Sequence, residues 1–251
     1  MARKPRFVAA KQAHLLSQSA FEGAPLFREE DDFVKFLALL KESAKVNGVS
    51  IHAYALLPTE IFLLATPQEA EGLSRFMQWL GRRYVPIYNQ KYARGGPLWR
   101  ARFRAAIVDG QSELIGACQF VEEAPLRAGL CAQASDYPWS SCQAHSGARR
   151  DALLTDHPGY WALGNTPFDR EMAYQRHLEQ ALTVAQVSHF EAALRSGWVI
   201  GPPGFAQALE QEAGRRLTPG RRGRPPGKGA RAAPKEGDMS PINEDEKLPN
   251  E

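Results

Sequence analysis

The side chains of this sequence that are most able to perform chemistry are six histidines and a run of arginines. No two histidines have the His-X-His, His-X-X-X-His or His-Glu-X-X-His spacing that brings two imidazoles to one metal ion. The sequence also lacks a Gly-X-Ser-X-Gly nucleophile elbow, a Walker phosphate loop and a dinucleotide fingerprint. It therefore presents no self-evident metalloenzyme or hydrolase site, and no metal ligands are predicted.

The arginines are more informative, because between Arg94 and Arg104 they alternate with aromatic residues. If residues 99–104 are extended, Arg100, Arg102 and Arg104 share one face of a strand. Such a row neutralises phosphates, and neighbouring rings stack on unpaired bases. The alternative is a solvated edge strand whose charges discourage aggregation. The predicted DNA-binding residues of this region are Arg82, Arg83, Lys91, Arg94, Trp99, Arg100, Arg102 and Arg104.

Charge is distributed unevenly along the chain. Residues 236–251 hold six acidic side chains and one basic one, so the net charge of +3 leaves +8 on residues 1–235. A basic body with an acidic tail is typical of a nucleic-acid partner, although surplus arginine also aids solubility. Within the tail, Arg221, Arg222 and Arg224 form an Arg-Arg-Gly-Arg-Pro segment similar to an AT-hook core, which binds a narrow minor groove. A plain flexible basic tail is the alternative.

Composition excludes several protein classes. With 43% hydrophobic residues the chain can form a core, so it is not wholly disordered. Its three cysteines are widely spaced, which excludes a disulfide scaffold and suits the reducing cytoplasm. No stretch approaches the ~18–20 apolar residues of a membrane span. We therefore expect a cytoplasmic location and no membrane partner.

The elements that must position the arginines follow the order β-α-β-β-α-β-α. Apolar spacing and turn residues predict these boundaries, and Pro86 is expected to kink or break the second helix. The order resembles the ferredoxin-like split βαβ arrangement, an α+β fold. The predicted elements are strands at 13–19, 49–57, 61–65 and 103–108 and helices at 29–47, 72–92 and 111–123.

The character of the chain changes near Trp139. Helical spacing predicts helices at 172–182, 184–195 and 205–216. The following residues are rich in Gly, Pro and basic side chains, so no fold is expected for them. We predict an α+β domain at 1–145, a helical C-terminal extension at 146–218, and a disordered tail at 219–251 that is first basic and then acidic.

Four stretches, in order and spacing, resemble the REP-associated tyrosine transposases, which belong to the HUH-type insertion-sequence transposases. The stretches are His52–Pro58, Gly95–Phe103, Pro125–Leu130 and Asp136–Ser141. The resemblance covers about residues 5 to 226. It implies a ferredoxin-like HUH domain that acts on hairpin or single-stranded DNA from palindromic repeats. Arg127, in the third stretch, joins the predicted DNA-binding residues.

The resemblance also implies a catalytic site, and this sequence departs from it throughout. In the family, two histidines after Pro-Asn bind a divalent metal such as Mg²⁺, a helical tyrosine attacks the DNA phosphate, and an asparagine assists the metal. Glu60 and Phe62 stand at the histidine positions, Phe120 at the tyrosine and Ala124 at the asparagine. Phe120 has no hydroxyl that could attack, and Phe62 cannot bind a metal. No cofactor is therefore expected.

Three hypotheses follow from these departures. The first is a transposase-like protein that binds DNA and has lost strand cleavage. The second is an active transposase in which Tyr84 or Tyr88 has become the nucleophile, with Glu60 in a rebuilt metal site; core packing is the alternative role for these tyrosines. The third is a protein-interaction factor that does not use DNA. The sequence leaves open whether a homodimer forms.

Overall fold

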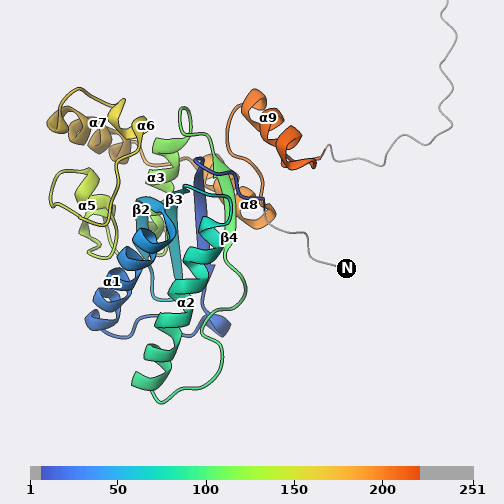
Figure 1. Ribbon diagram of the computed structural model, residues 1–251. Coiled ribbons are helices and arrows are strands. Elements are labelled where there is room, and N and C mark those ends of the chain that lie inside the picture. The colour runs from blue at the N-terminus through green and yellow to red at the C-terminus, as the bar shows by residue number, and fades with distance from the viewer. Residues whose placement is uncertain (1–6, 221–251) are drawn as a thin grey trace, which may run out of the picture. The chain divides into compact units, whose positions relative to one another are not determined.

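A four-stranded antiparallel sheet with the strand order β2-β3-β1-β4 forms the centre of the fold (Figure 1). The structure is a computed structural model that describes residues 7–220. In sequence the strands alternate with helices as β1-α1-β2-β3-α2-β4-α3, which confirms the predicted ferredoxin-like α+β arrangement. The strands are β1 (Ala13–Ser19), β2 (Val49–Leu56), β3 (Glu60–Pro67) and β4 (Arg104–Val108).

Helices α1 (Glu30–Asn47) and α2 (Gly72–Lys91) cover one face of the sheet, in front of it in Figure 1. The α1 helix begins at a capping box between Glu29 and Asp32. It ends at Gly48, whose φ of 60° is easily adopted only without a side chain. The predicted break at Pro86 is wrong, since α2 continues to Lys91. Pro86 lies on the exposed side of the helix, where water can bind the carbonyl that loses its partner.

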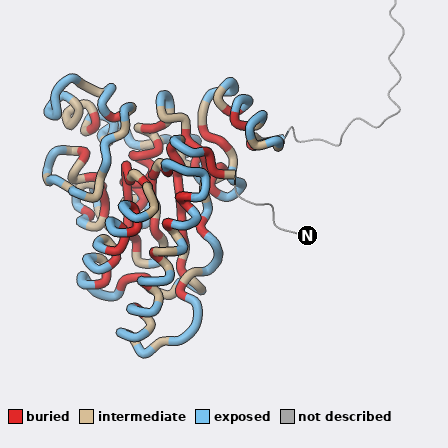
Figure 2. Tube along the Cα trace, in the orientation of Figure 1, coloured by how far each residue is buried: buried red, intermediate tan, exposed pale blue. Residues whose placement is uncertain are grey.

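The opposite face of the sheet packs against α3 (Leu114–Glu122) and α8 (Val184–Ser196). The chain up to Thr218 forms one compact unit, and Figure 2 shows its buried residues concentrated in the sheet and on the inner sides of the helices. The helical character predicted for residues 146–218 is confirmed. The remaining helices are α4 (Ala124–Arg127), α5 (Cys142–His145), α6 (Pro158–Trp161), α7 (Pro167–Glu179) and α9 (Pro203–Ala213), with short 3₁₀ turns at Phe21–Gly23 and Ala134–Asp136.

Both edges of the sheet are paired with irregular chain. Along β2, the amide of Leu56 donates to the carbonyl of Trp139 and the amide of Ser141 donates to that of Tyr54, each at 2.9 Å. Along β4, Ile200 forms a parallel bridge with Val108. The amide of Ile200 donates to the carbonyl of Ile107 at 2.8 Å. Within residues 7–220, no helix is both long and apolar enough to cross a membrane.

Two histidines inside the fold predict how stability depends on pH. Burial lowers the pKa of both His14 and His52 to about 4, so the folded protein holds them neutral. The Nδ1 of His52 donates to the carbonyl of Thr155, and its Nε2 accepts from the hydroxyl of Thr66. The unfolded chain takes up their protons near pH 6.5, so the free energy of unfolding falls between pH 6.5 and 4. Each histidine contributes a loss of about 3 kcal/mol.

Urea denaturation at pH 7, 6, 5 and 4 measures this loss. His52→Gln is expected to reduce the slope of stability against pH, whereas the same change at the exposed His189 leaves it unchanged. A wild-type stability that stays constant from pH 6.5 to 4.5 would contradict the prediction.

Candidate nucleic-acid interface

The positions where the resemblance places catalytic groups are filled by packed aromatic rings. Phe62 on β3 meets Phe120 on α3 edge to face, with ring centroids 6.0 Å apart. On its other side Phe120 packs against Phe190 of α8 at 5.0 Å. Phe120 is only 1% exposed, and Ala124 is buried beside it in the same core. The helix α8 therefore closes this position from the side opposite the sheet.

Arg127 packs against the same ring. Its guanidinium carbon lies 4.3 Å from the centroid of Phe120, and the guanidinium donates a hydrogen bond to the carbonyl of Phe120. Burial lowers the pKa of Arg127, although Glu123 lies 3.9 Å away and favours its charged form. The Arg127 side chain thus already holds the end of α3 in place.

The residues at the implied metal position do not fit a divalent metal. Phe62 has no donor atom, and the Glu60 carboxylate accepts a hydrogen bond from the Ser19 hydroxyl at 2.9 Å. Mg²⁺ needs several oxygen ligands, of which only this one carboxylate is present. Within residues 7–220 no three His, Cys, Asp or Glu side chains gather closely enough to bind a metal ion.

Tyr84 and Tyr88, the residues considered as replacement nucleophiles, are both 1% exposed. The Tyr84 hydroxyl donates to the carbonyl of Leu26 at 2.5 Å, and that of Tyr88 donates to the carbonyl of Pro25. Burial raises the pKa of Tyr84. Both tyrosines belong to the core between α1, α2 and the sheet, on the face away from Phe120. Core packing accounts for them.

Beside the aromatic rings lies a pocket of about 460 Å³ with six arginines in its lining. Ser17 lies between the aromatic rings and the pocket, because in the sheet it pairs with Phe62 of β3 on one side and with Arg104 of β4 on the other. None of the lining residues that the structure describes is Asp or Glu. Glu191 contacts Arg195 at 3.4 Å from outside the lining. The six are Arg100, Arg102, Arg104, Arg195, Arg215 and Arg216.

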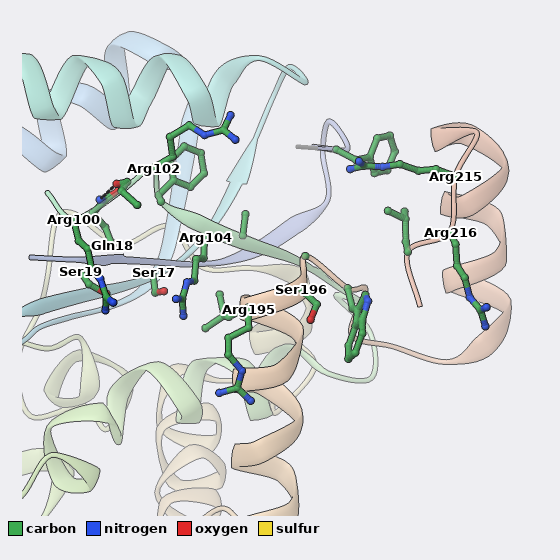
Figure 3. Close-up of a pocket in the computed structure, with 18 residues that line it drawn as sticks. Ser17, Gln18, Ser19, Arg100, Arg102, Arg104, Arg195, Ser196, Arg215 and Arg216 are labelled. Atoms are coloured by element: carbon green, nitrogen blue, oxygen red, sulfur yellow. Dashed lines mark hydrogen bonds between the residues drawn. The ribbon is translucent and has the colours of Figure 1, made fainter. Parts of the chain in front are cut away.

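Figure 3 shows how the arginines of the pocket are directed. Arg100, Arg104 and Arg195 extend to the same side of the sheet, whereas Arg102 extends to the other side, toward α2. The condition under which the three arginines would share one face is therefore not met, since only Arg104 lies in β4 and residues 100–102 form a bend. The bend arises because the amide of Arg100 donates to the carbonyl of Ser19, past the end of the β1–β4 ladder.

A second hollow of about 700 Å³ adjoins the first and contains Trp99. Arg102 and Gln18 line both hollows, and the Gln18 amide holds the bend by donating to the carbonyl of Ala101 at 2.6 Å. Arg82 lines the second hollow. Arg83 is close by on α2, with its guanidinium carbon 4.1 Å from the ring centroid of Trp79. Five of the predicted residues thus line the two hollows: Arg82, Trp99, Arg100, Arg102 and Arg104.

Other predicted residues lie elsewhere. Lys91 forms ion pairs with Glu29 and with Asp32 at the start of α1. Arg94 donates to the carbonyl of Pro97 at 3.1 Å within its own loop. Arg221, Arg222 and Arg224, with the AT-hook-like segment, lie outside the described residues, as does most of the predicted disordered tail.

Sequence reasoning missed three arginines of the pocket. Arg195 lies at the end of α8, and Arg215 and Arg216 follow α9, about a hundred residues from the arginines that they join. Gly197, with a φ of 70°, ends α8 and turns the chain so that Ile200 reaches β4. The Ser-Gly pair after Arg195 indicates the end of a helix, but no pattern in the sequence indicates that Ile200 pairs with β4.

Comparison with known proteins places the fold. No protein-family model and no curated protein sequence matches the chain. A solved structure described as a REP-associated tyrosine transposase bound to a REP hairpin matches 62% of this chain and 89% of its own, with 14% identity and a TM-score of 0.51. The two chains share a fold. A putative transposase from Deinococcus radiodurans matches 47% of this chain and 93% of its own at 21% identity, with a TM-score of 0.33 that is too low to argue from.

Proposed function

We propose that the chain is a transposase-like DNA-binding protein of the REP-associated tyrosine transposase family that binds hairpin or single-stranded DNA without cutting it. The observation that carries the proposal is the pocket with six arginines and no acidic lining residue. Guanidinium groups bind phosphate oxygens with two parallel hydrogen bonds. The shared fold supports the same ligand class, because the solved transposase of this fold was determined with a REP hairpin.

Exposure supports a role in binding. Arg100, Arg102 and Arg104 are exposed, and none of them has an ion-pair or hydrogen-bonding side-chain partner among residues 7–220. Neighbouring guanidiniums without acidic partners repel one another, so a polyanion that binds there gains favourable contacts and releases counterions. Trp99 in the adjoining hollow adds an aromatic surface for unpaired bases.

The chemistry of the replaced residues supports the absence of cleavage. Strand cleavage through a phosphotyrosine needs a hydroxyl nucleophile, and the ring at that position is a buried phenylalanine between two other phenylalanines. Tyr84 and Tyr88 donate their hydroxyl protons to backbone carbonyls on the other face of the sheet. Both tyrosines are only 1% exposed, so their hydroxyls are not positioned to reach a DNA phosphate.

Gel electrophoresis of the full chain with hairpin oligonucleotides from its own genomic flanks tests the proposal. With Mg²⁺ or Mn²⁺ present, we expect a shifted band on a native gel that disappears on a denaturing gel. The affinity of the protein for the hairpin should fall by about 10³ between 50 and 200 mM salt if six phosphates are contacted. The absence of a shift at 50 mM salt would overturn DNA binding, and a band that survives denaturation would overturn the absence of cleavage.

Phe120→Tyr is an informative variant in the same experiment. It restores the missing hydroxyl, but leaves it buried against Phe190 and without a metal site, so we expect no covalent adduct. Tyr84→Phe and Tyr88→Phe serve as the matching controls. An adduct that one of them abolishes would support the relocated nucleophile instead.

A further inference from the structure

We infer that the arginine pocket binds the terminal phosphomonoester of a DNA strand in preference to a phosphodiester within it. The inference rests on the proposed function and specifies which part of the DNA enters this site. It depends on four features of the pocket: its volume, the separate chain segments that form its walls, its concentration of charge, and the hydroxyl of Ser17 in one wall.

The size of the pocket fits a nucleotide. Its volume of about 460 Å³ lies within the range of roughly 300–1,000 Å³ that is usual for small-ligand sites. Its walls come from separate parts of the chain: β1 and β4 form one side, the bend at 100–102 a second, and the end of α8 with residues 215–217 the rest. A strand end can enter such a hollow, whereas a duplex has to remain outside.

The charge of the pocket exceeds what one phosphodiester can balance. Arg100, Arg104 and Arg195 extend to one side of the sheet, and of these only Arg195 has a carboxylate partner, Glu191 at 3.4 Å. A phosphodiester brings one negative charge. A phosphomonoester carries about −1.5 to −2 at pH 7 and presents three strong acceptor oxygens. Three guanidiniums therefore favour the monoester more than the diester.

Ser17 adds a hydroxyl donor that has no partner among residues 7–220. It lies on β1 in the pocket wall and is only 3% exposed. Among residues 7–220 its hydroxyl makes no hydrogen bond, whereas Ser19, two residues on, donates to Glu60. Because Ser17 lines the pocket, a ligand that enters can accept this proton. A phosphate oxygen held by Arg104, the β4 neighbour of Ser17, is suitably placed to be that partner.

The test uses one short single-stranded oligonucleotide in three forms, with a 5′-phosphate, a 3′-phosphate or hydroxyls at both ends, and measures affinity by fluorescence anisotropy. We expect one phosphorylated form to bind about tenfold more tightly than the hydroxyl form. Whether this is the 5′-phosphate or the 3′-phosphate form shows which end of the strand enters the pocket. Ser17→Ala and Arg104→Gln should each reduce the preference, while Arg150→Gln, at an exposed arginine outside the pocket, leaves it intact.

A pH series separates recognition of the monoester from a structural role of the same residues. The second pKa of a phosphomonoester is near 6, and none of the lining residues that the structure describes is His, Asp or Glu. Three acids adjoin the lining: Glu191 contacts Arg195, Glu60 accepts from the hydroxyl of Ser19, and Glu210 accepts from the amide of Leu217. The hydroxyl form of the oligonucleotide, measured at each pH, controls for any effect of these acids. The ratio of the two affinities should therefore fall between pH 7.5 and 5.5.

Equal binding of all three forms would overturn the inference and leave the proposed function intact. No binding of any form would overturn the inference, and it would overturn the proposed function as well where hairpin DNA also shows no shift. A preference that does not change with pH would also contradict recognition of the dianion.

Discussion

Replacing Arg100, Arg104 and Arg195 together with glutamine is expected to weaken the binding of single-stranded DNA by about 10²-fold or more. The three guanidiniums extend to one side of the sheet. Each charged hydrogen bond to phosphate contributes about 1.5 kcal/mol or more. Loss of three phosphate contacts should also reduce the slope of log affinity against log salt by about 2. Anisotropy titrations from 50 to 200 mM salt measure both quantities.

A matched triple variant controls for net charge. Lys45, Arg150 and Arg176 are exposed and lie outside the arginine pocket, so changing them to glutamine removes the same three charges. We expect a change in affinity of threefold or less. If the two triple variants weaken binding equally, overall charge rather than the pocket attracts the DNA, and the site is misassigned.

The largest effect on stability is expected at Glu122, whose side chain is completely buried. Its carboxylate accepts hydrogen bonds from Ser141, from the Nδ1 of His145 at 2.6 Å, and from the hydroxyl of Tyr174 at 2.6 Å. Burial alone would lower the pKa of His145, but the Glu122 charge raises it above its ordinary value. Glu122→Ala removes the acceptor of the buried His145 and Tyr174 donors and leaves Ser141 only the Tyr54 carbonyl, which should cost about 3–5 kcal/mol.

Urea denaturation of Glu122→Ala beside Glu179→Ala measures this cost. Glu179 is exposed near the end of α7, so its loss should change the free energy of unfolding by less than about 0.5 kcal/mol. Tyr174→Phe removes one of the three hydrogen bonds and should cost about 1–2 kcal/mol. A loss below 1 kcal/mol for Glu122→Ala would show that the buried network does not hold α5 and α7 to α3.

The fold was largely predictable, because its strands and helices have strong local signals. The apolar spacing of Phe33, Phe36 and Leu40 and the Asn-Gly pair at 47–48 define α1 without reference to any other element. The short elements between 124 and 161 were not predictable. Their residues are fixed by pairing, as when Ser141 accepts from the amide of Tyr54 at 2.9 Å across 87 positions of the chain.

The candidate site could be predicted only in part. Arg104 and its neighbours were identifiable by type and spacing, and the aromatic residues at Phe62 and Phe120 were readable from the sequence. The sequence could not show that Phe190 fills the space beside Phe120, or that Arg195 joins Arg104. Both depend on where α8 docks, which is decided by packing against β4 and α3 rather than by a local pattern.

The pairing along both edges of the sheet limits how two copies of this chain can associate. Backbone groups at Tyr54 and Leu56 of β2 are bonded to residues 139–141, and the carbonyl of Ile107 in β4 is bonded to Ile200. Open strand edges are the usual route to continuous sheets between molecules, to strand exchange and to fibrils. At these paired stretches, a second folded copy therefore finds no free backbone groups onto which it could add a strand.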